Sequence, residues 1–257
     1  TDSQLVAYLN YWPDSLSDPR GGLAYCMTSQ DGESWSAPQP VMMADGTQMQ
    51  GVFEQDPHVL ATGRFVCAGH FQPGLIVSPI WTDDPAGLTG WHKGTFTATV
   101  NGSASREMEP SLFVQRDGTV AMTFRDQNSS YHKLVSYSYD CGETWTAVEE
   151  TSMPDARTKQ SAGNLSEGTV FLAGSPVNNS VRSPLAVTIA VNGRTFDRAF
   201  LLRSNSSDPA LKYEGKAKRL GFHYTKSLVY NGNLYVGYAT NKEAVEISIV
   251  PESSLIS

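Results

Sequence analysis

Apolar and polar residues alternate along most of the chain in short runs, the pattern of β-strands with one buried face. Five such runs are Leu5–Trp12, Arg64–Phe71, Thr119–Arg125, Thr169–Ser175 and Asn233–Thr240. Turn residues separate the runs, and Asp117-Gly118 and Asn231-Gly232 are pairs that reverse two strands tightly. Helical periodicity is nearly absent, so the pattern predicts an all-β protein of many short strands.

Two kinds of turn marker recur along the chain. A turn glycine precedes four of the runs, at Gly63, Gly118, Gly168 and Gly232. An aromatic residue closes a later turn in four units, at Trp35, Trp91, Trp145 and Phe196, with spacings of 56, 54 and 51 residues. Two independent markers with one period, and about four strands in each period, predict a β-propeller with four-stranded antiparallel blades.

The repeat divides the chain into five units, which we expect to form a single propeller domain over residues 1–257. The units cover residues 1–45, 46–100, 101–153, 154–205 and 206–257. The first opens on a run that matches the second strand of the other units, and the last stops before a fourth strand. We therefore expect at least one strand to precede Thr1 in the natural protein, and six or seven blades in the whole.

The aromatic turns carry a motif with a structural role. Residues Ser138 to Trp145 read S-Y-D-C-G-E-T-W, which matches the Asp box, S-x-D-x-G-x-T-W, at every fixed position. Residues 29–35 form the same box one residue short, and residues 190–196 form a degenerate copy. The aspartate accepts backbone N–H groups across the turn and the glycine adopts positive φ, so the box holds a hairpin together. Three boxes at the repeat period resemble the sialidase-like propellers.

The resemblance extends to single residues in the last three units. Glu109-Pro110-Ser111, followed by Asp117-Gly118 and Arg125, is similar to the sialidase segment E-P-x…D-G…R. The segments around Arg182 and Tyr224 resemble those of a second arginine and of the nucleophilic tyrosine, and the order of the four residues is the family's. The resemblance implies that Tyr224 attacks the sugar and that Glu109 polarises the Tyr224 hydroxyl. It also implies that Arg125 and Arg182 bind the substrate carboxylate. An Arg guanidinium suits that task because its fork of donors matches a carboxylate.

The second sequence repeat, residues 46–100, departs from the sialidase pattern. The family's third arginine and its R-I-P motif are absent, and Asp56 is only a positional candidate for the acid or base. His58 and His70 instead resemble the histidines of related propellers that act as rhamnosidases or rhamnose–glucuronate lyases. In such a lyase, arginine would neutralise the uronate carboxylate and His70 could move the proton, while His58 would contact substrate.

Composition narrows the classes of partner. The formal charge is -7 and Lys and Arg form no block, which disfavours nucleic acid as a partner. No apolar run approaches the roughly 18 residues of a membrane span. Three cysteines give no disulfide framework or metal spacing, and no cofactor motif is present; Asp83 and Asp84 could at most help to hold Ca²⁺. Five Asn-x-Ser sequons favour a secreted protein, extracellular or periplasmic; they begin at Asn101, Asn128, Asn164, Asn178 and Asn205.

These observations lead to three functional hypotheses. The first is a sialidase-like exo-acting glycosidase that cleaves a terminal bond of an acidic oligosaccharide or polysaccharide. The second is a lyase or rhamnosidase that uses histidine and arginine. The third is a propeller that binds glycan or protein without catalysis, in which the arginines and histidines would be tied up in internal pairs.

Overall fold

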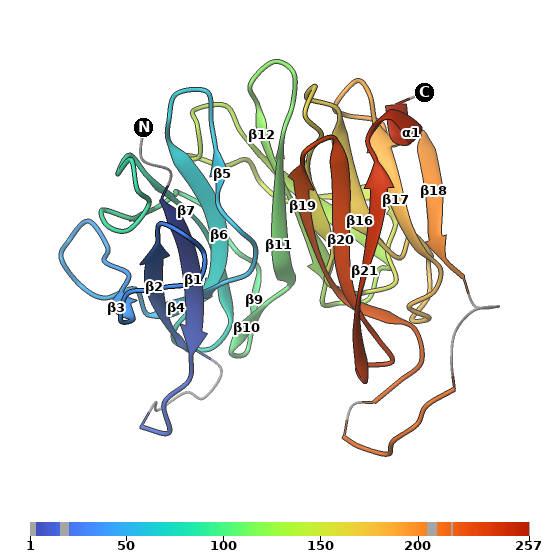
Figure 1. Ribbon diagram of the computed structural model, residues 1–257, viewed down its shortest axis with the longest axis horizontal. Helices are drawn as coiled ribbons and strands as arrows, with labels where there is room; N and C mark the ends of the chain where they lie inside the picture. Colours follow the sequence, from blue (N-terminus) through green and yellow to red (C-terminus); the bar gives the residue numbers. More distant parts are fainter. Residues whose placement is uncertain (1–3, 16–20, 205–209, 217, 257) are drawn as a thin grey trace. The chain divides into compact units, whose positions relative to one another are not determined.

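The computed structural model describes residues 4–15, 21–204, 210–216 and 218–256. The chain is all-β and has the β-propeller fold predicted from its repeats, with five antiparallel sheets as blades (Figure 1). It divides into two compact units, one of residues 1–106 and 138–147 and the other of residues 107–137 and 148–257. Within the described ranges, no helix is long and apolar enough to cross a membrane.

The first unit holds two blades. The first blade is a three-stranded sheet of β1 (Leu5–Tyr11), β2 (Leu23–Ser29) and β3 (Gln39–Pro40). The second is ordered β4 (Gly51–Phe53), β6 (Phe65–Phe71), β7 (Ile76–Thr82) and β8 (His92–Lys93), with β5 (His58–Val59) also paired to β6. A hairpin of β9 (Val100–Asn101) and β10 (Ala104–Ser105) follows.

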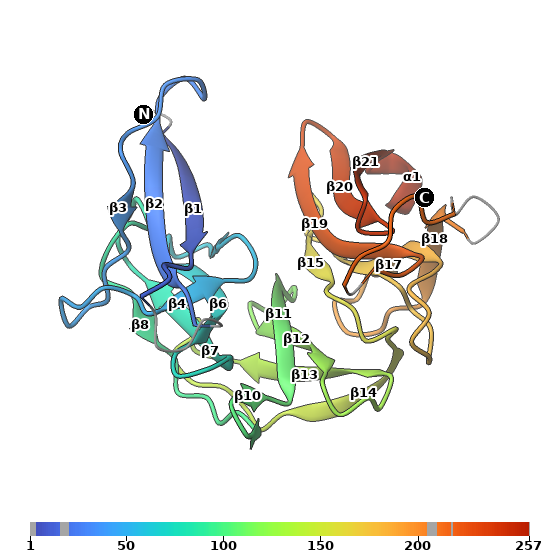
Figure 2. The ribbon, with the colours of Figure 1, turned by 90° about the horizontal axis from the view of Figure 1, so that it is seen from below.

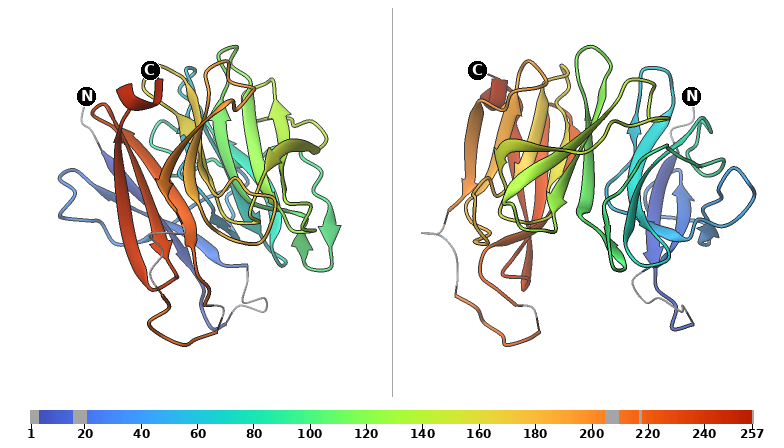
Figure 3. Two further views of the ribbon diagram at one scale, coloured as in Figure 1. Left: turned by 90° about the vertical axis from the view of Figure 1, so that its right-hand side faces the viewer. Right: turned by 180° about the vertical axis from the view of Figure 1, so that it is seen from behind.

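The second unit holds the other three blades. The third consists of β11 (Glu107–Val114), β12 (Val120–Asp126), β13 (His132–Ser138) and β14 (Glu149–Pro154). The fourth consists of β15 (Ser161–Asn164), β16 (Val170–Gly174), β17 (Leu185–Ala190) and β18 (Arg198–Arg203). The last has β19 (Phe222–Tyr230), β20 (Asn233–Thr240) and β21 (Ala244–Pro251), followed by the short helix α1 (Ser253–Ile256), coloured red in Figures 1 and 3.

The first strands of the last three blades lie next to one another. Strand β11 packs against β15, and β15 packs against β19, as Figure 2 shows within this unit. Apolar residues from neighbouring blades fill the space between the sheets, such as Phe113 with Leu172 and Phe171 with Val236. The burial of these side chains fixes the spacing of the three first strands, on which the candidate site is built.

The repeated aromatic turns have equivalent places in four blades, as predicted. Trp35, Trp91, Trp145 and Phe196 each lie between the third and fourth strand positions of their sheet. The predicted boxes make the expected bonds. Asp140 Oδ1 accepts the Thr144 N–H at 2.8 Å, and the Trp145 indole donates to the Gly142 carbonyl at 3.0 Å.

The second blade carries a longer turn of the same kind, which the sequence motif did not reveal. Asp84 accepts the backbone N–H groups of Leu88 and Thr89, each at 2.9 Å, and the Trp91 indole donates to the Gly87 carbonyl at 3.0 Å. Asp83 instead forms an ion pair with Arg64. Both carboxylates therefore serve the fold of this turn, and no cluster of metal-ligating side chains occurs in the described ranges.

Candidate active site

The four residues singled out by the sialidase resemblance all lie in the second unit. Glu109 is on β11 and Arg125 is on β12 of the same blade. Arg182 lies in the segment before β17, and Tyr224 is on β19 of the last blade. The four residues lie on three blades whose first strands are neighbours. They can therefore belong to one site.

Glu109 and Tyr224 occupy matching irregularities of their first strands. The pairing of β11 with β12 shifts between Met108 and Ser111, and that of β19 with β20 shifts between His223 and Lys226. Glu109 and Tyr224 have φ values of 51° and 58°, in the left-handed region. A bulge of this kind re-aims a side chain, and non-glycine residues with positive φ cost about 1–3 kcal/mol each and cluster at functional sites.

Lys159 has the equivalent place in the blade between them, two residues before β15 begins. Ser111, Ser161 and Lys226 each pair with the fifth residue after their blade's turn glycine, namely Thr123, Ala173 and Gly237. Counting back two residues from each gives Glu109, Lys159 and Tyr224. The register therefore places an acid, a base and a phenol in a row, and comparison of these three strands is the signal by which Lys159 could have been found in the sequence.

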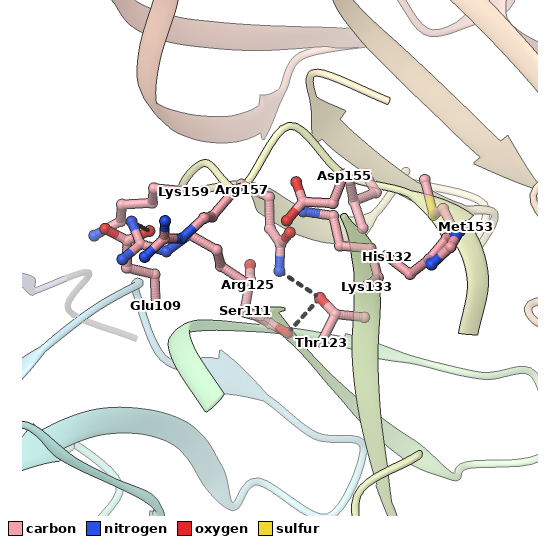
Figure 4. A network of polar contacts seen from close by, with 12 residues as sticks. Glu109, Ser111, Thr123, Arg125, His132, Lys133, Met153, Asp155, Arg157 and Lys159 are labelled. Carbon is pink, nitrogen blue, oxygen red and sulfur yellow. Dashed lines mark hydrogen bonds and ion pairs between the residues drawn. The ribbon is translucent and has the colours of Figure 1, made fainter. Parts of the chain in front are cut away.

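Arg125 and Glu109 form the centre of a charged cluster. Arg125 Nη1 lies 2.9 Å from Glu109 Oε2, and Arg125 Nη2 donates to the Gln127 side chain at 2.7 Å. Both charged side chains are largely buried, with exposures of 14% and 15%. Figure 4 shows the side chains of Arg157 and Lys159 gathered at the same place. Cations therefore outnumber the single carboxylate of this group.

Arg182 is the most deeply buried member of the site, with 6% exposure. Its Nη1 donates to His223 Nδ1 at 3.0 Å and its Nη2 donates to the Arg157 carbonyl at 3.1 Å, while its Nε has no hydrogen-bond partner among the described residues. Burial and the charge of Arg219 lower the pKa of Arg182, whereas Glu109 opposes this. Glu109, Arg125 and Tyr224 are all close enough to act on this guanidinium electrostatically.

A glycine allows this placement of Arg182. Gly221 forms a parallel bridge with Arg182, and the N–H of Phe222 donates to the Arg182 carbonyl at 2.8 Å. Gly221 has a φ of 106°, and a Cβ added to it would lie 2.6 Å from the Arg182 carbonyl oxygen. Only glycine permits this close approach, which ties the segment of Arg182 to the start of β19.

A buried ion pair supports the cluster from the side of β13. Lys133 Nζ lies 2.7 Å from Asp155 Oδ1, and the two side chains are 3% and 1% exposed. Burial lowers the pKa of Lys133, and the charge of Asp155 opposes that shift. This pair was not predicted from the sequence, because the two residues are 22 positions apart and belong to no motif. Figure 4 shows it beside Arg125 and Arg157.

The candidates of the second blade lie in the first unit. His70 is seven residues after Gly63, as Arg125 is after Gly118, and both are on the second strand of a blade. The His70 ring is 1% exposed, and its Nδ1 lies 2.6 Å from Glu54 Oε1. Glu54 was not predicted from the sequence, although it is the acid that orients this imidazole.

The other two candidates of this blade differ in exposure. Asp56 is exposed, and His58 is half-buried. Desolvation lowers the pKa of His58 to about 4, against the opposing charge of Asp56. His58 is therefore neutral over most of the physiological range. The roles predicted for Asp56, His58 and His70 stay predictions.

Family comparison identifies the repeats. Residues 1–236 match the family described as a BNR repeat-like domain. The chain belongs to the BNR repeat-like family. The sialidase-like resemblance inferred from the Asp boxes is confirmed at the level of the superfamily. No curated protein matches the sequence significantly.

Solved structures show the same fold. A protein of unknown function from Dyadobacter fermentans DSM 18053 is similar with a TM-score of 0.70 and 19% identity, over 97% of this chain and 73% of that one. The K499G mutant of NanB sialidase from Streptococcus pneumoniae has a TM-score of 0.68 and 16% identity, over 90% and 36%. An intramolecular trans-sialidase from Ruminococcus gnavus, in complex with oseltamivir carboxylate, has a TM-score of 0.66 and 16% identity. The match covers 92% of this chain and 52% of that one.

The low identities and partial coverage limit these matches to the fold. At such identities the likeness shows the sialidase-type propeller fold. The chain spans about a third to a half of the length of the two sialidase structures. The chemistry must therefore be argued from the chain's own residues.

Proposed function

We propose that this chain carries the substrate-binding and nucleophilic part of a sialidase-like glycosidase that acts on the end of an acidic oligosaccharide or polysaccharide. Arg125 and Arg182 bind the carboxylate of the terminal sugar. Tyr224 is the nucleophile, and Glu109 is its base.

One observation carries the proposal most strongly. Glu109 and Tyr224, which the family resemblance selects, are also the two residues held with positive φ at matching bulges of the first strands β11 and β19. The other non-glycine residues with positive φ on the described chain include turn residues such as Asn231 and Asn241. Strain placed at two matching positions beside a group of cations is the arrangement expected of a functional site.

The proposed chemistry fits the charges of the cluster. The phenol oxygen of Tyr224 attacks the anomeric carbon, the phenol proton moves to Glu109, and the glycosidic bond breaks toward the leaving sugar. Water then displaces the tyrosine oxygen, so the products are the free acidic sugar and the shortened glycan. A neutral phenol suits an anionic substrate better than a carboxylate nucleophile, which would repel it, and sialidases with a tyrosine nucleophile are a known departure from the two-carboxylate rule. The oxygen of the leaving sugar takes a proton from solvent, and Glu109 returns its proton to the tyrosine oxygen when water displaces it.

The contact between His70 and Glu54 supports a second candidate function. A buried imidazole oriented by a carboxylate is the usual arrangement of a proton-transfer residue. In that reading the chain is a rhamnose–glucuronate type lyase or a rhamnosidase, with His70 as the group that moves the proton and His58 in substrate binding.

A direct assay separates these activities from binding alone. The purified protein is incubated with sialyllactose and, separately, with a uronate-containing polysaccharide. Release of free sialic acid supports the first proposal, and ultraviolet absorbance of an unsaturated uronate supports the lyase. The matched variants are Tyr224→Phe and Glu109→Gln, with Tyr230→Phe on the same strand as a control that should keep activity. Binding without turnover of either substrate would support the non-catalytic propeller.

We also propose that the protein is secreted, on the strength of its sequons. Asn101, Asn128 and Asn178 are exposed. The Asn164 amide instead donates to the carbonyls of Val114 and Gly168, so this side chain serves the fold. The sequon at Asn205 lies outside the described residues. Glycopeptide mapping of protein from a eukaryotic host should find sugar at the exposed sites and none at Asn164.

A further inference from the structure

His223 is a buried residue that none of the functional hypotheses uses. It precedes Tyr224 on β19, and its side chain is fully buried. Both ring nitrogens are engaged: Nδ1 lies 3.0 Å from Arg182 Nη1, and Nε2 lies 3.2 Å from the Arg219 carbonyl oxygen. A guanidinium can only donate and a carbonyl can only accept, so the two partners require a neutral ring with the proton on Nε2.

The surroundings of the ring favour this neutral form. Burial and the charge of Arg182 lower the pKa of His223 to about 4, and the charges of Lys242 and Arg219 act in the same direction, against the Arg219 carbonyl. The Tyr224 ring, which is also titratable, has its centroid 6.0 Å away. A proton on Nδ1 would abolish the bond to Arg182 and set two cations against each other.

A neutral partner has a consequence for Arg182. A buried guanidinium is usually compensated by a carboxylate. Here the protein acceptors of Arg182 are the imidazole of His223 and the carbonyl of Arg157, both neutral, and no carboxylate forms an ion pair with Arg182 in the described part of the chain. The orientation of the guanidinium is fixed while its charge is left for an incoming anion.

We infer that His223 is a positioning residue that holds Arg182 through a neutral acceptor, so that the full charge of the guanidinium is directed at a carboxylate of the substrate. This inference rests on the proposed function and deepens it, because it makes the preference for an acidic sugar depend on a residue that does not touch the substrate. A carboxylate at position 223 would satisfy the same donor and remove the preference.

Three substitutions separate orientation from charge. His223→Gln supplies a neutral acceptor and a donor, His223→Glu supplies an anionic acceptor, and His223→Leu supplies neither. The measurement is kcat/KM on a sialoside and on its carboxyl-reduced analogue. The preference is the ratio of kcat/KM on the sialoside to kcat/KM on the analogue. We expect this ratio for His223→Gln to stay within roughly threefold of the wild-type ratio. His223→Glu and His223→Leu should each lower this ratio by roughly tenfold or more, the size of one lost charge-assisted hydrogen bond.

The results distinguish this inference from the proposed function. A wild type that treats both substrates alike would overturn the proposed function and the inference with it. A wild type that prefers the acid, together with a His223→Glu variant that prefers it equally, would overturn the inference alone.

A measurement without turnover guards against variants that do not fold. Long-range ¹H–¹⁵N spectra of the wild-type protein near about pH 5.5, below the ordinary histidine pKa of about 6.5, report the state of each ring. We expect the His223 signal, assigned by its loss in His223→Gln, to be that of a neutral ring protonated on Nε2. An imidazolium at this pH, or a ring protonated on Nδ1, would overturn the inference.

Discussion

Replacement of Arg182 by lysine tests the carboxylate-binding role while it preserves the charge. Two of the five N–H donors of a guanidinium are bound to His223 and Arg157, and the Nε is buried without a hydrogen-bond partner among the described residues. A lysine ammonium has three donors at a single point. If it keeps both protein acceptors it has at most one donor left, so the two-pronged contact with a carboxylate is lost.

The expected loss follows from that count. One charge-assisted hydrogen bond contributes about 1.5–3 kcal/mol, which corresponds to a roughly ten- to hundredfold decrease in kcat/KM. The decrease should appear on the sialoside and be much smaller on its carboxyl-reduced analogue, since the analogue never made the bond. Equal losses on both substrates, with an unchanged melting temperature, would refute the role of Arg182 in carboxylate binding.

Three further predictions concern the framework of the site. Asp140→Ala removes the acceptor of the third-blade Asp box and should cost about 1–3 kcal/mol in urea unfolding without a direct effect on turnover; an unchanged midpoint with lost activity would contradict this. Gly221→Ala places a methyl group against the Arg182 carbonyl and forces positive φ on alanine, so Tm and kcat/KM should fall together, by about 1–3 kcal/mol in stability. Lys133→Met leaves Asp155 buried and unpaired and should lower the free energy of unfolding by about 3–5 kcal/mol. A second change, Asp155→Leu, should restore most of that loss. A double variant no more stable than the single variant would argue against the importance of the pair.

The repeat architecture was predictable from sequence because it is written in local signals. A turn glycine, an Asp box and a closing aromatic act within a few residues of one another, so Trp35, Trp145 and Phe196 could be assigned to equivalent turns without coordinates. Trp91 was assigned to an equivalent turn as well, but the role of Asp84 was missed. Asp84 and Trp91 are seven residues apart, longer than the motif allows, although the turn makes the same kinds of bond.

The candidate site was predictable only where a family motif marks it. Glu109, Arg125, Arg182 and Tyr224 could be selected by resemblance and order. His223 and the Lys133–Asp155 pair could not, because their roles come from contacts between blades or between neighbouring strands of one blade. Lys159 belongs to no motif, but a comparison of the three first strands could have found it. A sequence pattern gives the period of the strands, whereas the neighbours of a side chain across two blades depend on the packing of the sheets.

The cluster in the second unit is proposed to bind the carboxylate of an acidic sugar. The most direct test is a crystal structure of the protein bound to N-acetylneuraminic acid. We expect the carboxylate to accept hydrogen bonds from both Arg125 and Arg182, with the Tyr224 hydroxyl facing the anomeric carbon. A bound sugar whose carboxylate contacts neither arginine would show that the two arginines do not bind the substrate carboxylate.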